Sequence, residues 1–241
     1  MTPEHIHPRR KDRTRGADWI RAFLHRAGAG VFVSVRDGRP FPIPLNFVYH
    51  EAREAVYLHT GKRGRSRSNL EEGAGVDGKS VLEQAGESAG APEDSALEQA
   101  EESAGAGEDS APDEAAGSAA TEGPETGPAA GTPVALCLYE VGRFLPAKEA
   151  LEFGVEYASV VVFGRGVVVE DLQEAEEALT LLMEKYAPHL EAGKDYRPVV
   201  PEEIRRTTVM RLDIQGWSGK EKAEAPDFPG AYRLEEVRPS P

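Results

Sequence analysis

A long acidic segment without aromatic residues is the feature that most constrains the fold of this 241-residue chain. From Glu71 to Thr132 the sequence has sixteen Asp and Glu, one Lys, and no Phe, Tyr, Trp or Cys. A segment of this kind cannot bury enough apolar surface to offset the entropy lost on ordering it. We therefore predict a disordered, low-complexity insertion at 71–132, between the two parts of one folded domain, 1–70 and 133–241.

The insertion contains a tandem repeat of fifteen residues. LEQAGESAGAPEDSA at Leu82–Ala96 is followed directly by LEQAEESAGAGEDSA at Leu97–Ala111. This period matches no common solenoid unit, and the recurring Gly and Pro oppose a stable helix. The net charge of −15 leaves one functional alternative open, an interaction segment that recruits a basic partner.

Outside the insertion, the sequence is typical of a domain with a single hydrophobic core. Its charge is balanced, with 27 Lys and Arg against 26 Asp and Glu, which argues against a nucleic-acid-binding protein. The lone Cys137 excludes an intrachain disulfide, and no apolar run has the length of a signal peptide or a membrane span. We expect a cytoplasmic protein that does not associate with membranes.

Alternating apolar residues predict six β-strands. Asp37-Gly38 is typical of a tight hairpin turn, and Pro42 and Pro44 favour an edge position or a bulge for the return strand. Gly164 and Gly166 on one face of a later strand indicate a sharp bend or a close backbone contact. The expected fold is a mainly β (α+β), six-stranded antiparallel split barrel with flanking helices. The predicted strands are 31–36, 39–50, 55–61, 133–144, 157–170 and 207–217.

Two helices are predicted beside the barrel. The first follows Asp18 as its N-cap and stops before Gly28. The second begins after Asp171, with Glu174 at the reciprocal capping position. Its apolar face is expected to consist of Leu172, Ala175, Leu179, Leu182 and Tyr186.

The sharpest chemical signal is YLHTGKRGRSRSNL, at Tyr57–Leu70, where a strand ends in a cationic loop. Exposed backbone N–H groups, hydroxyls and guanidinium groups are the donors that suit a phosphate. The pattern is not that of an NTPase phosphate loop, and a plain basic surface turn is an equal alternative. The cations of this loop are Lys62, Arg63, Arg65 and Arg67.

The other reactive residues form no recognisable site. Cys137 alternates with apolar residues in VALCLYE and is interpreted as a core residue. The six histidines show no spacing with Cys or carboxylates that would hold a metal, so no metal site is predicted.

Four stretches, taken in order, resemble the pyridoxamine 5′-phosphate oxidase-like flavoproteins, and most closely their nitroimidazole-resistance, flavin-nucleotide-binding branch. They are GRPFPIPLNFVYH, AVYLHTGKRGRSRSNL, EYASVVVFGRGVVVEDLQEAEEALTLLMEKYAP and TTVMRLDIQGWSGK. The resemblance covers most of residues 9–70 and 133–222. It implies an FMN-binding split barrel that works as a homodimer, with flavin at the subunit interface.

The resemblance also implies the positions that contact the cofactor. One stretch matches the phosphate loop, one the strand beside the flavin ring, one the strand end near ring and substrate, and one the segment that usually reads Tyr-Arg-Ser-Val. His59 is in addition the candidate catalytic residue. These positions are Lys62, Gly64, Arg65 and Ser66; Pro44, Leu45, Asn46 and Phe47; His59 and Thr60; and Ser159 and Val160.

The chain departs from the pattern of that branch at two places. Ala158 stands where Tyr-Arg-Ser-Val usually has its Arg, and GRFLPAKEALEFGVE lacks a His-His pair. From the phosphate loop and the family resemblance we expect an FMN-dependent oxidoreductase acting on a small aromatic or nitro compound. The two departures favour the alternative, a non-catalytic flavin or haem binder.

Overall fold

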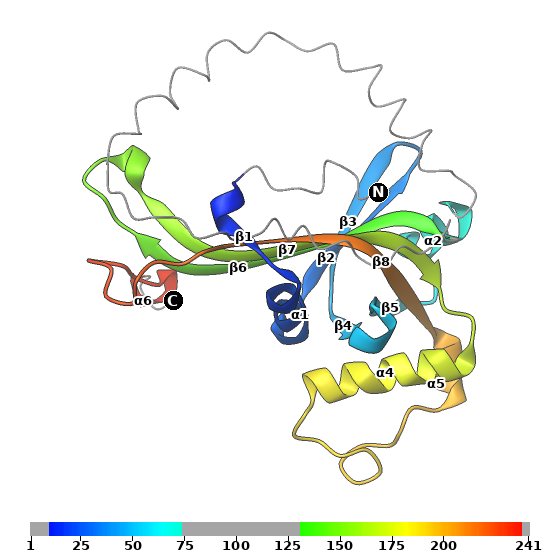
Figure 1. The fold of residues 1–241 in the computed structure, drawn as a ribbon. Coiled ribbons are helices and arrows are strands. Elements are labelled where there is room, and N and C mark those ends of the chain that lie inside the picture. The colour runs from blue at the N-terminus through cyan, green and yellow to red at the C-terminus, as the bar shows by residue number, and fades with distance from the viewer. Residues whose placement is uncertain (1–9, 74–130, 238–241) are drawn as a thin grey trace. The chain divides into compact units, whose positions relative to one another are not determined.

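The structure, a computed structural model, describes residues 10–73 and 131–237. These residues form one unit, built of a single antiparallel sheet with helices against it (Figure 1). The strands are β1 (Thr14–Arg15), β2 (Gly30–Arg36), β3 (Arg39–Leu45), β4 (Phe47–His50), β5 (Ala55–Gly61), β6 (Thr132–Leu145), β7 (Gly154–Val168) and β8 (Thr207–Lys222). The α-helices are α1 (Ala17–Arg26), α2 (Arg65–Gly73), α4 (Leu172–Tyr186), α5 (Pro201–Arg206) and α6 (Leu234–Val237), with short 3₁₀ turns at Lys11–Arg13, Glu51–Arg53 and Ala150–Glu152.

The strand order curls the sheet into a barrel. The order is β3-β2-β6-β7-β8-β5-β4, with β1 paired to β8. The two end strands, β3 and β4, are consecutive in the chain and separated only by Asn46. Because one residue joins the two edges of the sheet, the edges must approach each other.

The sheet has eight strands rather than the six predicted. The return segment of the first hairpin divides at Asn46, so β3 pairs with β2 while β4 pairs with β5. The short β1 was not predicted. Pro40, Pro42 and Pro44 lie in β3 at the end of the order, which confirms the edge position expected from their missing N–H donors.

Two local turn predictions are confirmed. Asp37 and Gly38 have φ of 51° and 70°, as a two-residue hairpin turn of the primed type requires. At Gly164 the pairing of β7 with β8 shifts register, and an added Cβ would clash with the backbone oxygen of Asp213. The strand bends here because only glycine tolerates so close a contact.

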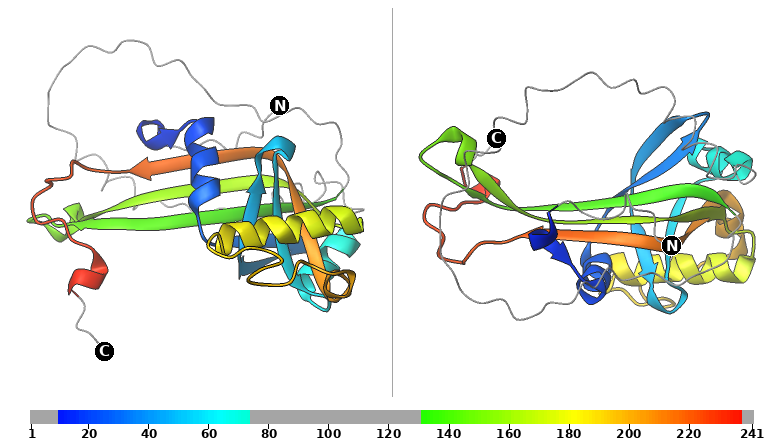
Figure 2. Two further views of the ribbon diagram at one scale, coloured as in Figure 1. Left: turned by 90° about the horizontal axis from the view of Figure 1, so that it is seen from below. Right: turned by 45° about the horizontal axis from the view of Figure 1, so that its top comes forward.

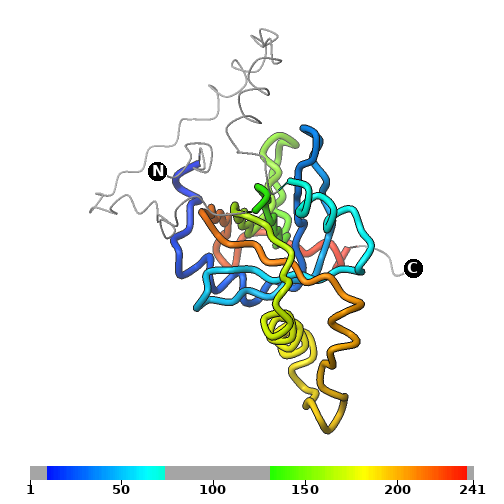
Figure 3. Tube along the Cα trace, turned by 90° about the vertical axis from the view of Figure 1, so that its right-hand side faces the viewer, coloured from blue at the N-terminus to red at the C-terminus, as the bar shows by residue number. Residues whose placement is uncertain are grey.

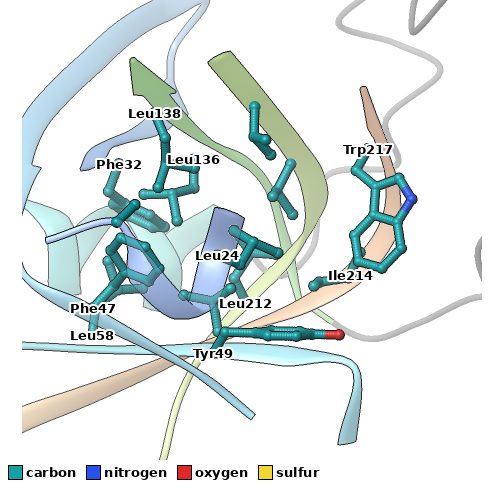
Figure 4. Close-up of a cluster of buried hydrophobic side chains, with 14 of the residues drawn as sticks. Leu24, Phe32, Phe47, Tyr49, Leu58, Leu136, Leu138, Leu212, Ile214 and Trp217 are labelled. Atoms are coloured by element: carbon teal, nitrogen blue, oxygen red, sulfur yellow. The ribbon is translucent and has the colours of Figure 1, made fainter. Parts of the chain in front are cut away.

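The main core fills the inside of the curled sheet, closed by α1 (Figure 4). Phe23 and Leu24 of α1 meet Phe32 of β2, Leu58 of β5 and Leu212 of β8 there, and none is more than 1% exposed. Burying each such side chain contributes about 1.5–3 kcal/mol.

A second apolar cluster lies under α4 and α5 on the outer face of β4, β5 and β8. Val48, Tyr57 and Val209 of the sheet pack there against Leu182 and Ile204 of the helices. Figure 3 looks along α4 and shows it beside these strands. Helices therefore cover only part of the outer face of the barrel.

The predicted helices form, with three corrections at their ends. Gly16 rather than Asp18 is the N-cap of α1, because the Asp18 side chain points to solvent and pairs with Arg21. Asp171 caps α4 as expected, accepting from the Glu174 backbone N–H at 2.7 Å. The Glu174 side chain does not return to the cap.

Instead, Glu174 Oε1 accepts hydrogen bonds from the Tyr57 hydroxyl at 2.7 Å and from Arg211 at 2.6 Å. Leu172 is exposed, whereas Ala175 and Leu182 are buried as predicted. Tyr186, at the other end of the predicted face, is also exposed, so only the middle of that face is buried.

The predicted insertion overlaps the described residues at both ends. Residues 71–73 continue α2, and Thr132 is already paired in β6. The remainder of the segment, with both copies of the repeat, lies outside the described residues. In the described part of the chain, no helix is long and apolar enough to cross a membrane.

The long strands β6, β7 and β8 separate two ends of the unit. The helix α2 lies at one end, and the β6–β7 hairpin with the C-terminal segment lies at the other (Figure 2). Phe144 of β6 pairs with Tyr232 in an isolated bridge, and their rings stack with centroids 5.7 Å apart. The C-terminal segment is thus attached to the hairpin.

Candidate functional site

The cationic stretch that follows β5 is a short loop and then a helix. The strand ends at Gly61 and α2 begins at Arg65, so residues 65–70 are helical rather than part of an extended loop. Gly64 lies against the strand end, where an added Cβ would be 3.9 Å from Thr60 Oγ1. The loop therefore turns back tightly and presents the N-terminus of α2 next to the end of β5.

Three cations at this turn have no acidic partner among the described residues. Lys62 Nζ donates to the backbone oxygen of Arg205 at 2.8 Å, and the Arg65 guanidinium lies 5.0 Å from the centre of the Phe41 ring. No carboxylate in residues 10–73 and 131–237 pairs with Lys62, Arg63 or Arg65. These unpaired charges stand at a helix N-terminus, where backbone N–H groups and the helix dipole also favour an anion.

The fourth cation of the stretch already has an acidic partner. Arg67 pairs with Glu71 at 2.7 Å and donates to Thr208 Oγ1 at 3.4 Å. Ser66 is buried, with 3% of its surface exposed. The anion-binding potential therefore belongs to the loop and the start of α2 rather than to the whole helix.

A second candidate surface is the part of the outer sheet face that α4 and α5 leave open. Residues in cross-strand register point to the same side of a sheet, so each row across it shares one face. One row is Pro44, Val31, Cys137, Val161 and Ser218, and the next is Pro42, Val33, Ala135, Phe163 and Gly216. Most of these side chains are apolar and partly exposed, and they form an open outer wall.

Strand alternation divides the predicted ring-contacting residues between the two faces. Pro44 and Ser159 lie on the open outer wall, in register with Val31 and Tyr139. Phe47 and Val160 are fully buried in the core. Their side chains are therefore withdrawn from the candidate site, a correction that follows from the period of two in a β-strand.

Phe47 is also covered from its remaining side. Lys185 Nζ lies 3.8 Å from the centre of its ring, and burial lowers the pKa of this lysine to about 8. The residues just before Phe47 remain accessible, since Leu45 is half-buried and Asn46 is exposed.

The two residues at the end of β5 also point in opposite directions. His59 is exposed and in register with Val209, on the outer face that α4 and α5 partly cover. Thr60 is half-buried and paired with the buried Thr208. Of the two, Thr60 is the one that the structure brings next to the cationic loop.

Ala158, which replaces the Arg of the related pattern, is buried within the main core. Its position alternates with Ser159 and so faces inward.

The remaining predictions concern Cys137 and metals. Cys137 is half-buried on the outer wall, not in the core, and burial raises the pKa of its thiol, which disfavours the reactive thiolate. Among the described residues no group of His, Cys, Asp and Glu is arranged to hold a metal.

Contacts below α2 were not predicted. Asn69 donates to Ser34 at 2.9 Å, and Thr132 Oγ1 donates to the backbone oxygen of Leu70 at 3.0 Å. Strand alternation could have placed Ser34 on the inner face. No local pattern shows that α2 would cover it.

Comparisons with known proteins agree with this architecture. Residues 116–221 match the protein family described as pyridoxamine 5′-phosphate oxidase. No curated protein matches the chain.

Among solved structures, the flavocytochrome Anf3 from Azotobacter vinelandii is similar with a TM-score of 0.61 and 18% identity, over 99% of this chain and 89% of that one. A FAD and heme binding protein from Mycobacterium smegmatis is similar with a TM-score of 0.55 and 16% identity, over 89% and 76%. A more distant match, at a TM-score of 0.49 and 15% identity over 86% of both chains, is a candidate 5-nitroimidazole antibiotic resistance protein from Bacteroides thetaiotaomicron.

Proposed function

Because residues 116–221 match the pyridoxamine 5′-phosphate oxidase family, we propose that the chain is an FMN-dependent oxidoreductase of the FMN-binding split-barrel type. Electrons would pass from a reduced nicotinamide or another reductant, through FMN, to a small nitroaromatic or similar acceptor. The observation that carries the flavin part is the set of unpaired cations, Lys62, Arg63 and Arg65, at the start of α2.

These residues fit the phosphate of FMN. Two guanidinium groups and one ammonium group, which pair with no carboxylate in the described part of the chain, lie in the loop around Gly64 and at the first residue of α2. Charge-assisted hydrogen bonds from such groups are the strong contacts of phosphate sites. Thr60, at the strand end against Gly64, would add a hydroxyl donor.

The open outer wall fits the flavin ring. Its partly exposed rows, with Val31 and Val161 at their centre, offer a flat apolar surface of the kind that binds a planar ring. An apolar sheet face left without helices is also suited to a second copy of the chain. We therefore propose a homodimer with flavin at its interface and both copies contributing to the site.

The residues of this chain would bind and orient, while the redox chemistry belongs to the cofactor. When bound, FMN supplies hydride and electron transfer. Ser159 on the outer wall would donate a hydrogen bond to a polar ring edge. His59, exposed and without a hydrogen-bond partner among the described residues, would hold or deliver a proton at its imidazole nitrogen.

An absorption spectrum of the purified protein tests the proposal. We expect a flavin spectrum as isolated or after addition of FMN, and bleaching of the bound flavin by NADH or NADPH without oxygen. A colourless protein that takes up no added FMN would overturn flavin binding. Stable flavin that no nicotinamide reduces, and that passes no electrons to a nitroaromatic after chemical reduction, would overturn the oxidoreductase.

The second candidate is a non-catalytic flavin or haem binder on the same fold. It is favoured by the buried Ala158, which removes a cationic contact, and by the similarity to two proteins named for flavin and haem. A Soret band after reconstitution with haem, together with flavin that resists reduction, would support this candidate. Reducible flavin without a Soret band would exclude it.

A further inference from the structure

Two side chains one turn apart on α2 contact two residues that lie opposite each other in the β2–β3 hairpin. Asn69 Nδ2 donates to Ser34 Oγ at 2.9 Å, and the Arg65 guanidinium lies 5.0 Å from the centre of the Phe41 ring. Ser34 and Phe41 are a registered cross-strand pair. Residues four apart share a helix face, so one face of α2 contacts both members of one cross-strand pair.

The Asn69–Ser34 hydrogen bond is buried, and it therefore stabilises only one alignment of α2 on the sheet. Asn69 is 1% exposed and Ser34 is 0% exposed, and the apolar side chains of the main core surround this end of the barrel. A buried polar group that loses its hydrogen bond bears the full cost of desolvation. A shift of α2 along the sheet would separate the amide from the hydroxyl.

No alternative partner compensates such a shift within the described residues. The second amide atom of Asn69, Oδ1, is buried and accepts no hydrogen bond there. Because a serine hydroxyl both donates and accepts, either orientation of the amide keeps one bond to Ser34. This single bond is the only side-chain hydrogen bond of Asn69 in the described part of the chain.

The backbone of α2 is held next to this contact. Thr132 Oγ1 donates to the backbone oxygen of Leu70 at 3.0 Å and lies 3.4 Å from that of Asn69. The C-terminal half of α2 is thus attached to β2 and β6. The first turn follows as a rigid extension, and it sets the place of Arg65 on Phe41 and of the loop before it.

We infer that Asn69 and Ser34 are positioning residues for the phosphate-binding cations, and that they act through the placement of α2 rather than by touching the ligand. The inference rests on the proposed flavin function. It concerns the phosphate group of the ligand. The Asn69–Ser34 pair determines how strongly the site prefers a phosphorylated flavin over the same flavin without phosphate.

The test compares FMN with riboflavin, which differ only in the phosphate. Asn69→Ala and Ser34→Ala each remove one side of the contact. The double variant S34A/N69L replaces both polar groups with apolar ones, which core positions tolerate better than one unpaired polar group. Ser68→Ala is the matched control, because Ser68 bonds only to the backbone of Gly64 within the same turn.

We expect Asn69→Ala and S34A/N69L to weaken FMN binding about tenfold, the effect of losing one well-placed hydrogen-bonded contact. Riboflavin binding should change less than about twofold, because the cations do not contact it. The control should bind both ligands as the wild type does. In the ligand-free protein, amide hydrogen exchange across residues 65–73 should rise in the Asn69 variant and not in the control.

Equal weakening of FMN and riboflavin in a folded variant would overturn the positioning role and leave the flavin function standing. Unchanged FMN affinity in the double variant would overturn it as well. A wild type that binds neither ligand would overturn the flavin function itself, and the inference with it. If Asn69→Ala does not fold, the double variant decides between these results.

Discussion

Arg143 Nη2 and Glu156 Oε1 lie 2.6 Å apart across the β6–β7 hairpin, and together they hold the C-terminal segment. Arg143 donates to Pro226 O at 2.7 Å and Ala225 O at 3.0 Å, while Glu156 accepts from the Glu224 backbone N–H at 2.8 Å. Only 12% of the Glu156 side chain is exposed. This ion pair, at the end of the unit opposite α2, therefore connects three parts of the chain.

Arg143→Leu should release the C-terminal segment. We expect unfolding at a lower urea concentration than in the wild type, because several charge-assisted hydrogen bonds are lost together. Limited proteolysis should cut after Lys222 sooner than in the wild type. Arg205→Leu, which removes an exposed pair with Glu202 at a similar distance, should cost less than about 1 kcal/mol. Equal effects of the two changes would contradict this prediction.

The same pair predicts a dependence of stability on pH. The hydrogen bond from Arg143 lowers the pKa of Glu156 from 4.5 to about 2. A carboxyl with a lowered folded pKa stabilises the protein above its unfolded pKa, and this contribution is lost as the pH falls from about 4.5 to about 2. Urea unfolding of the wild type and Glu156→Gln should therefore differ by about 2 kcal/mol at pH 7 and converge towards pH 2. A difference that is constant over this range would exclude the linkage.

Arg65→Ala should weaken FMN binding by about 1.5–3 kcal/mol, the usual contribution of a hydrogen bond to a charged group. Titration of flavin fluorescence measures it. Arg67→Ala removes the same charge from the same helix, but Arg67 is already paired with Glu71, so its effect on FMN should be clearly smaller. If both variants bind FMN like the wild type, the cations form only a basic surface turn.

Gly164→Ala should destabilise the barrel strongly. The new methyl group would clash with the backbone oxygen of Asp213, and a backbone atom cannot move aside as a flexible side chain can. We expect a loss of at least about 3 kcal/mol in chemical unfolding, at or above the upper range for overpacking. Gly28→Ala is the control, because nothing lies within 4 Å of its added Cβ. A mild effect at Gly164 would mean that the bulge can relax.

Replacing residues 75–129 by a short Gly-Ser linker should leave the barrel intact. The two ends of the segment already meet, since an added Cβ at Gly73 would lie 2.6 Å from Thr132 Oγ1. Shortening a connection of this length changes loop-closure entropy by only about 1–2 kcal/mol. We expect a melting temperature within a few degrees of the wild type and unchanged uptake of FMN.

A large fall in the melting temperature would instead show that the segment contributes to the folded unit. Loss of a basic partner protein in the deletion variant, with flavin binding retained, would support the interaction function that the acidic composition left open.

The strands, the main helices and the phosphate-like loop could be predicted because each depends on residues close together in the chain. Asp37 and Gly38 specify a turn by themselves, Asp171 caps its own helix, and the glycine at 164 allows a local bend. Alternation also predicted the strand that contains Phe47. It did not tell which face of that strand would be buried.

The sequence by itself thus determined the order and type of the main elements, the edge position of β3 and the cationic turn at the end of β5. Only the tertiary structure decided that the return strand divides at Asn46, that Phe47 and Val160 face the core, and that Asn69 of α2 meets Ser34. The stability of turns and helix caps depends on residues that are close together in the chain. Burial and buried hydrogen bonds depend on partners brought together from distant positions, and no short pattern contains them.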